Sequence, residues 1–134
     1  MQLDQNEPKL LGNTNDHLFI HGEDPSDFLA LFSSLVTEYQ PTTVRQQTLV
    51  EDAAIAQWIV WRRNRTIQRH ESAIYSNNSD IFEWTLESFH LLRHMQQFRA
   101  IAERTCARAF ARLDAMRRQQ IADKRWQLNF ELQQ

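Results

Sequence analysis

The residues Glu87, His90 and His94 come closest in this sequence to the make-up of a metal site. Their spacing places all three side chains on one face of a helix. Two imidazoles and a carboxylate can hold iron or zinc. Di-iron helical bundles, however, use a Glu-x-x-His motif from each of two helices together with further Glu residues. This chain has a single Glu-x-x-His motif, so we expect no metal and no cofactor and treat the three residues as weak candidates.

Cys106 is the one cysteine of the chain, and its position argues against catalysis. It falls on an apolar stripe between Ala102 and Ala109, whereas a nucleophilic thiol needs an exposed, electropositive setting and a neighbouring base. We therefore predict a small buried side chain here. The sequence also has no Gly-rich phosphate loop and no nucleophile elbow. These patterns predict a protein that is not an enzyme.

Two groups of arginines are candidates for binding an acidic partner. The first group lies next to Trp58 and Trp61, and the second forms a row with a spacing of four residues. Like charges at that spacing cost roughly 0.2–0.5 kcal/mol per pair, so the row should meet carboxylates or phosphates. Arginines among aromatic residues are typical of nucleic-acid surfaces and equally of cation–π packing between helices. The first group comprises Arg62, Arg63, Arg65 and Arg69, and the second Arg104, Arg108 and Arg112.

The net charge of −2 is unevenly distributed along the chain. Residues 1–55 carry nine acidic and two basic side chains, whereas residues 56–134 carry eight acidic and thirteen basic ones. The basic part can therefore face either the acidic part of its own chain or an acidic partner. The isoelectric point near 6.2 argues against a dedicated nucleic-acid binder, whose value often exceeds about 9.

The elements that position these residues are predicted to be helices. Gly and Pro, the residues least favourable inside a helix, are absent from residues 42–134. Apolar residues recur at helical spacing over three segments, at about 25–40, 43–75 and 80–120. Asp24-Pro25 is typical of a helix start. Thr43-x-x-Gln46 and Asp80-x-x-Glu83 resemble the capping boxes that begin a helix.

The predicted fold is all-α, with a long antiparallel helical hairpin, similar to a coiled coil, and a short N-terminal amphipathic helix. We expect a loosely ordered segment over residues 1–23, a helical domain over 24–120 and a tail over 121–134. Residues 126–132 alternate between apolar and polar types, which fits either an extended segment or a frayed helix end. Leu18–Ile20 is predicted to be either a strand or an apolar anchor. The alternatives for residues 126–132 and those for Leu18–Ile20 stay open.

A helical hairpin buries only one stripe of each helix, and the large aromatic residues do not all fit on one seam. This pattern favours a homo-oligomer, most simply a dimer that forms a four-helix bundle. We therefore predict a non-catalytic interaction or assembly protein, with a nucleic-acid binder and a metal-binding helical bundle as alternatives. The residues predicted to form the hydrophobic interface are Trp58, Trp61, Trp84, Phe89, Phe98 and Phe110.

The first residues are polar and acidic and lack the basic and apolar segments of a secretory signal. The longest apolar stretches, such as residues 59–61, are too short to span a bilayer. A single cysteine allows no internal disulfide, which fits a reducing compartment. We therefore expect a cytoplasmic protein without membrane association.

The run from Ile20 to Pro41, "IHGEDPSDFLALFSSLVTEYQP", resembles an uncharacterised family of short helical bacterial proteins common in Acidobacteria and similar soil bacteria. Those proteins share a Gly-Glu-Asp-Pro helix start, a Gln-Pro helix end and a helix whose Trp precedes an Arg-rich run. Here that run is Trp61-Arg62-Arg63-Asn64-Arg65. The resemblance covers residues 18–75 well and 95–120 loosely, and this chain lacks the family's basic N-terminal segment ending in His-Gly-Leu. It implies a helical fold and no particular activity.

Overall fold

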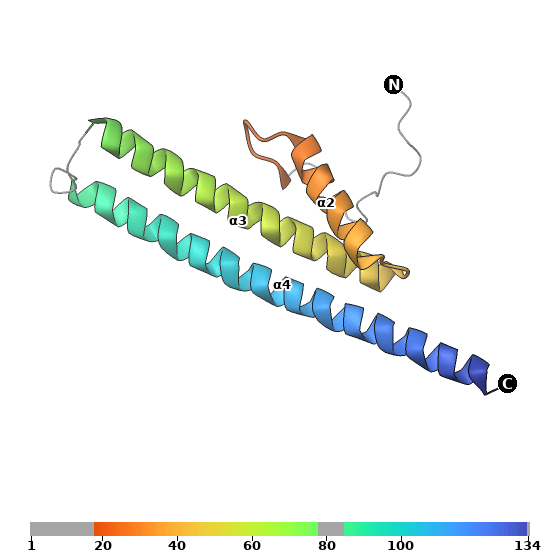
Figure 1. Ribbon diagram of the computed structural model, residues 1–134. Helices are drawn as coiled ribbons and strands as arrows, with labels where there is room; N and C mark the ends of the chain where they lie inside the picture. Colours follow the sequence, from red (N-terminus) through yellow and green to blue (C-terminus); the bar gives the residue numbers. More distant parts are fainter. Residues whose placement is uncertain (1–17, 78–84, 134) are drawn as a thin grey trace, which may run out of the picture. The chain divides into compact units, whose positions relative to one another are not determined.

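The computed structural model describes residues 18–77 and 85–133, and over these residues the protein is all-α (Figure 1). The helices are α2 (Pro25–Tyr39), α3 (Val44–Asn77) and α4 (Leu86–Leu132). The described residues contain no strand, so the all-α prediction is confirmed. None of the described helices combines the length and the hydropathy needed to cross a membrane.

Helix α2 begins and ends as its sequence predicts. Asp24 is the N-cap and accepts a hydrogen bond of 2.9 Å from the Ser26 backbone N–H, and Pro25 occupies the first helical turn. At the other end Gln40 adopts a left-handed conformation with φ of 46°, and its N–H donates to the Val36 carbonyl. Such a residue closes a helix by satisfying a carbonyl that the last turn leaves open.

Helix α3 begins with a variant of the predicted capping box. The Thr43 hydroxyl accepts a hydrogen bond of 3.2 Å from the Gln46 N–H. The Gln46 side chain accepts from the N–H and the hydroxyl of Thr42, whereas in a standard capping box it would reach the N–H of the capping residue itself. The helix continues to Asn77, slightly beyond the predicted end at residue 75.

Helix α4 differs from the prediction of 80–120 at both ends. It begins at Leu86, where the Thr85 hydroxyl accepts a hydrogen bond of 3.1 Å from the Ser88 N–H. The predicted start at Asp80-x-x-Glu83 lies outside the described residues. At the other end the helix continues to Leu132, so the extended alternative for residues 126–132 is wrong. A helix propagates from existing turns at little cost, and no Gly or Pro interrupts it.

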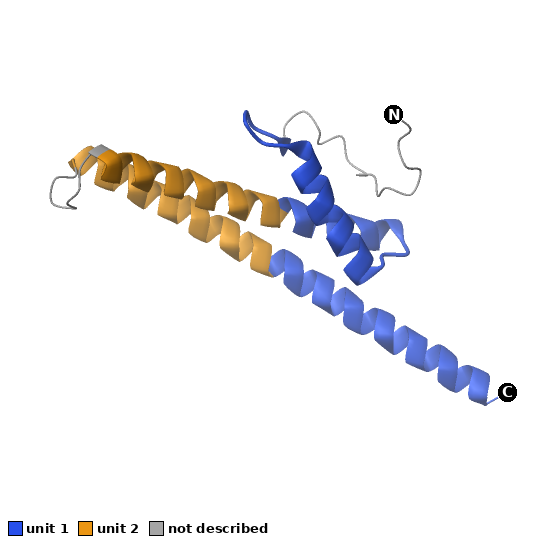
Figure 2. Ribbon diagram, turned by 45° about the horizontal axis from the view of Figure 1, so that its top comes forward, with its two compact units in different colours: residues 1–55, 108–134 blue, residues 56–107 orange. Residues whose placement is uncertain are grey.

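The chain divides into two compact units (Figure 2). Unit 1 comprises residues 1–55 and 108–134. Its largest fully buried aromatic side chains are Phe28 and Phe32, whose rings stack at 6.3 Å, and Phe19 meets Phe28 edge-on at 5.7 Å. Leu18 is also buried. The segment Leu18–Ile20 therefore anchors the chain to unit 1 through apolar contacts and is not a strand.

Unit 2 comprises residues 56–107, the second part of α3 and the first part of α4. The two segments run antiparallel, because Gln57 contacts Cys106, Arg63 contacts Phe98 and His70 contacts Ser88. Apart from one tryptophan, the buried side chains are small or medium in size, so the core is a thin seam. The regular packing of a coiled coil stays a prediction. The buried residues of this unit are Ala56, Trp58, Val60, Ile67, Ile74, Ala102 and Cys106.

Candidate functional site

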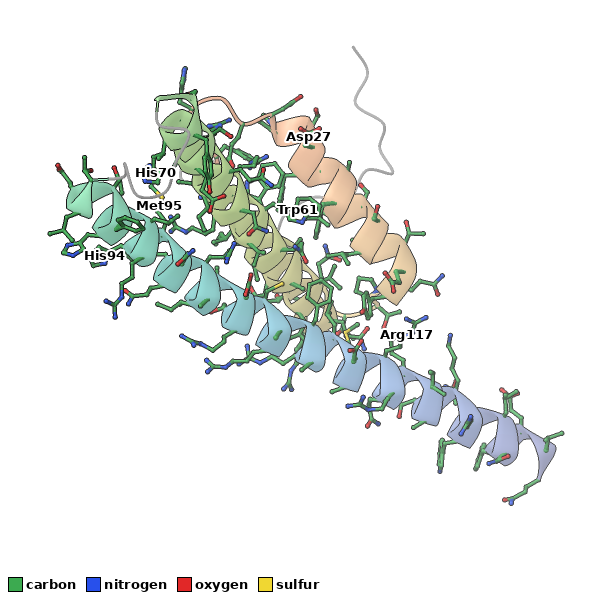
Figure 3. The ribbon with its side chains drawn as sticks, turned by 60° about the vertical axis from the view of Figure 1, so that its left-hand side comes forward. Asp27, Trp61, His70, His94, Met95 and Arg117 are labelled. Carbon is green, nitrogen blue, oxygen red and sulfur yellow. The ribbon has the colours of Figure 1, made fainter. Side chains whose placement is uncertain are left out.

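The candidate metal ligands Glu87, His90 and His94 are all exposed on α4. The imidazole of His94 points away from its helix (Figure 3). Metal binding needs donor atoms that converge to about 2.0–2.2 Å from one ion. Among residues 18–77 and 85–133, no group of three His, Cys, Asp or Glu side chains is placed to do this. The metal-binding alternative therefore receives no support from the described part of the chain.

Unit 2 itself uses part of the first arginine group. The guanidinium of Arg63 lies 5.6 Å from the centre of the Phe98 ring, and that of Arg65 lies 5.3 Å from the Trp58 ring. Cation–π contacts of this kind stabilise a fold by about 0.5–1 kcal/mol at exposed sites. Arg62 is half-buried and Arg69 is exposed. The Arg63–Phe98 contact joins α3 to α4, whereas the Arg65–Trp58 contact lies within α3. Both guanidinium groups are therefore used by the fold of unit 2.

The arginine row on α4 differs from the first arginine group in its contacts. Arg104, Arg108 and Arg112 are exposed, and none of them forms an ion pair or a cation–π contact with another residue in the described ranges. By contrast, Arg117 on the same helix pairs with Glu38 at 3.6 Å. The three positive charges of the row are therefore not neutralised by the described part of their own chain.

The six residues predicted to form a hydrophobic interface differ in their exposure. Trp58 is 1% exposed and belongs to the core, which corrects its assignment to a surface. It follows Val50 and Ala54 at intervals of four residues, and all three lie on the same buried stripe of α3. Phe110 is half-buried, and Trp84 lies outside the described residues. The side chains of Trp61, Phe89 and Phe98 are exposed.

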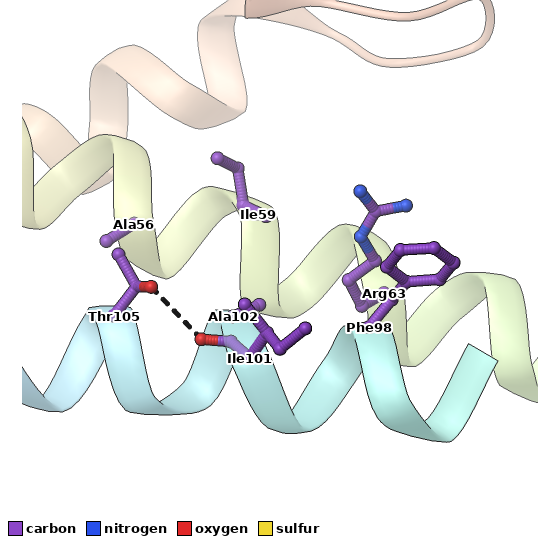
Figure 4. Close-up of a pocket in the computed structure, with 7 residues that line it drawn as sticks. All are labelled: Ala56, Ile59, Arg63, Phe98, Ile101, Ala102 and Thr105. Atoms are coloured by element: carbon purple, nitrogen blue, oxygen red, sulfur yellow. Dashed lines mark hydrogen bonds between the residues drawn. The ribbon is translucent and has the colours of Figure 1, made fainter. Parts of the chain in front are cut away.

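Phe98 also lines an open groove of about 180 Å³ in unit 2 (Figure 4). Ile59 and Ile101 provide further apolar walls, and Arg63 lies at one end. The Thr105 hydroxyl donates its hydrogen to the Ile101 carbonyl at 3.0 Å. This hydrogen is therefore used within α4 and is not free to bind a ligand. The groove therefore suits an apolar side chain of a partner and offers little for the recognition of a polar ligand.

The last three turns of α4, residues 121–132, are exposed along their whole length, and we call them the C-terminal helical segment. Trp126 and Phe130 stack on each other at 5.5 Å, one helical turn apart. Sequence reasoning missed this surface because it left open an extended segment here. The four-residue interval between the two aromatic residues was the signal for a helix. The large exposed apolar residues are Ile121, Trp126, Leu128, Phe130 and Leu132.

Unit 1 contains a second open groove of about 500 Å³, which we call the α3-start groove. It lies between the first turns of α3 and a stretch of α4. Arg112 belongs to the predicted row, whereas Arg45 was not among the candidates because it stands far from the other arginines in sequence. The local sequence does not relate Arg45 to Arg112, since only the fold brings them to one groove. The residues that line it are Thr43, Arg45, Gln46, Leu49, Arg112, Ala115, Met116 and Gln119.

Tyr39 connects the end of α2 to α4 within unit 1. Its hydroxyl donates a hydrogen bond of 3.2 Å to the Asp114 carboxylate, and Arg117 lies over its ring at 5.6 Å. Burial raises the pKa of Tyr39, and the hydrogen bond to Asp114 raises it further. Next to this cluster the Gln120 amide donates to the Gln46 side chain at 3.1 Å. These contacts hold the start of α3 and the facing part of α4 in register.

Cys106 is buried, as predicted, and lies 3.6 Å from the side-chain oxygen of Gln57. Burial raises the pKa of the Cys106 thiol, which lowers the fraction of reactive thiolate at neutral pH. The geometry and the pKa therefore both favour a structural role for this residue.

No protein-family model, curated protein or solved structure matches this chain. The assignment of function therefore rests on the surfaces of the chain itself. Two of them stand out: the exposed C-terminal helical segment and the α3-start groove.

Proposed function

We propose that this chain is a non-catalytic helical interaction protein of the cytoplasm that self-associates, most simply as a dimer. The observation that carries the proposal is the C-terminal helical segment, whose five large apolar side chains are 46–84% exposed. A helix of this length is marginal in water without tertiary packing. Its apolar side chains form two exposed patches, with Ile121, Leu128 and Leu132 on one face and Trp126 and Phe130 on the opposite face. Exposed apolar patches mark interaction sites. A partner that covers the segment would stabilise the helix and remove its apolar surface from water.

The segment is complementary to a second copy of itself. Ile121, Leu128 and Leu132 are seven and four residues apart and share one face. Lys124 and Glu131 both lie on the same flank of that face. When two copies pair antiparallel about a twofold axis between residues 127 and 128, the Lys124 of each copy lies beside the Glu131 of the other. The sequence thus places opposite charges at the reciprocal positions that antiparallel self-pairing requires.

A stable dimer of standard size buries about 800 Å² on each partner, which is more than three helical turns provide. The groove of unit 2 lined by Phe98 and Ile101 offers further apolar surface. We therefore expect association through the C-terminal helical segment alone to be weak, and a stable dimer to use other exposed apolar residues as well.

Light scattering of the purified protein tests the proposal. We expect a molar mass of twice the chain mass for the wild type, unchanged by salt and free of nucleic acid. Leu128→Asp should shift the mass to that of the monomer, because a charge would enter the apolar face. Ala122→Asp is the matched control, since Ala122 is exposed in the same segment but lies off the face that Ile121, Leu128 and Leu132 share. A monomeric wild type, or equal disruption by both substitutions, would overturn the proposal.

Charge reversal tests the antiparallel register. Lys124→Glu should weaken association by placing like charges beside Glu131 of the second copy. The double variant Lys124→Glu, Glu131→Lys should restore it, because the pair is re-formed with the charges exchanged. Failure of the double variant to recover the mass of the dimer would rule out this register.

Nucleic-acid binding is the second candidate, and the exposed row of Arg104, Arg108 and Arg112 favours it. Binding through these guanidinium groups would release counterions, so the affinity should fall steeply with salt. Fluorescence anisotropy with labelled oligonucleotides at two salt concentrations measures this. Arg108→Gln should weaken binding and reduce the salt dependence by about one counterion. Binding that is absent at low salt would exclude this function.

A further inference from the structure

The α3-start groove gathers positive groups from separate elements of unit 1. Arg45 comes from the first turn of α3 and Arg112 from α4, and both line the groove. The N-terminus of α3 carries the positive end of the helix dipole, and its first turn holds no acidic residue. Two guanidinium groups and a helix start therefore contribute to one concave surface.

Two described carboxylates of unit 1 have partners outside the groove. Asp114 accepts the hydrogen bond from Tyr39, and Glu38 pairs with Arg117. Neither Arg45 nor Arg112 forms an ion pair with any residue that the structure describes. Both guanidinium groups of the groove are therefore without an ion-pair partner among the described residues.

The groove also has an apolar component. Met116 is buried and Leu49 is half-buried, and both line it together with Ala115. The Thr43 hydroxyl accepts from the Gln46 N–H, which leaves its own hydrogen to donate to a ligand. A volume of about 500 Å³ is within the range of sites that hold small organic molecules. The surface thus pairs a cationic end with an apolar wall.

We propose that the α3-start groove binds a small organic oxyanion, a carboxylate or phosphate carried on a short apolar body. Arg45 and Arg112 hold the oxyanion, since the planar guanidinium presents donors that match the oxygens of either group. Leu49 and Met116 contact the apolar body. The site is independent of self-association, because all its residues belong to unit 1 of a single chain and none lies in the C-terminal helical segment.

Titration with hexanoate and with hexyl phosphate tests the proposal, followed by the amide resonances of residues 43–46 in ¹H–¹⁵N spectra. We expect saturable shifts, and an affinity lower by about tenfold in Arg45→Gln and in Arg112→Gln, because each variant loses a charge-assisted hydrogen bond. Arg104→Gln is the matched control, since it removes an exposed arginine of the same helix that does not line the groove. Leu49→Ala should weaken the binding of both alkyl probes, through lost apolar contact.

The two probes separate the sources of the oxyanion. Tighter binding of hexanoate assigns a carboxylate ligand, and tighter binding of hexyl phosphate assigns a phosphate ligand. Hexanol is the uncharged control and should not bind. The proposal is overturned if neither anion binds, if hexanol binds as tightly as the anions, or if Arg104→Gln weakens binding as much as Arg112→Gln. Circular dichroism of each variant confirms that the helices are retained.

Discussion

Several polar side chains at the helix ends have clear structural roles. Tyr39 ties α2 to α4 through Asp114, and Asp24 caps α2 through the N–H of Ser26. Thr43 does the same for α3 through the Gln46 N–H. Because Thr43 and Gln46 both line the α3-start groove, the bond between them also helps to define its shape.

Replacing Tyr39 with Phe should destabilise the protein by about 1 kcal/mol at pH 8, since it removes one hydrogen bond and little packing. The pKa of Tyr39 is raised in the folded state, so the folded state favours the neutral phenol. Its contribution is fully present below the unfolded pKa of about 10 and is lost as the pH rises through the folded pKa. Urea unfolding at pH 8 and above pH 10 should show this difference between wild type and Tyr39→Phe becoming smaller.

Ser34→Ala is the control, because it removes a hydroxyl that is exposed on the same helix as Tyr39. It should leave the free energy of unfolding nearly unchanged at both pH values. An equal loss in the two variants would contradict the role given to Tyr39.

Asp24→Ala should lower the stability of the protein at neutral pH, because it removes the N-cap of α2. The hydrogen bond from the Ser26 N–H lowers the pKa of Asp24 below its ordinary value of 3.8. The stabilisation is present above that value and is lost as the pH falls through the folded pKa. Thermal unfolding at pH 7 and at pH 2 should show a difference only at pH 7. Asp24→Asn should retain most of the stability, since asparagine is also a good cap.

Among the elements, α4 changes character along its length. Ala109, Leu113 and Met116 are buried in unit 1, whereas residues 121–132 are exposed on every face. After Gln120 the positions that continue the buried stripe are polar, with Asp123, Lys124 and Gln127. The helix therefore continues while its core-facing stripe ends. The apolar residues of the segment are therefore not covered by any residue that the structure describes.

Two identical substitutions on α4 distinguish core from surface. Leu113 is 0% exposed, so Leu113→Ala should cost about 2–5 kcal/mol through lost burial and a cavity. Leu128 is 59% exposed, so Leu128→Ala should change the stability of the monomer by no more than about 0.5 kcal/mol. Urea unfolding at low protein concentration measures both values. A large loss in Leu128→Ala under these conditions would show that the segment packs on its own chain.

For the molecule as a whole, self-association should be coupled to stability. A partner that binds only the folded chain raises the unfolding midpoint as its concentration rises. We therefore expect the midpoint of thermal unfolding to increase with protein concentration for the wild type. In Leu128→Asp the midpoint should be much less dependent on concentration. A wild-type midpoint that is constant over a hundredfold range of concentration would argue against a dimer that is linked to folding.

The sequence by itself determined the helical class, the start and end of α2, the cap of α3 and the burial of Cys106. These features depend on local physics: caps bind the N–H groups of the next turn, Gly and Pro interrupt helices, and apolar periodicity marks one face. The candidate arginines of the row and several exposed aromatic residues were also found in this way, because composition and spacing reveal them.

Only the tertiary structure decided which faces are covered. Trp58 and Trp61 are three residues apart in sequence, yet Trp58 is buried and Trp61 is 43% exposed. Likewise Arg45 and Arg112 meet in one groove only because α3 and α4 pack together in unit 1. Helical periodicity defines the faces of a helix but does not say which neighbour covers each face, since burial and the convergence of distant charges depend on contacts between segments far apart in the chain.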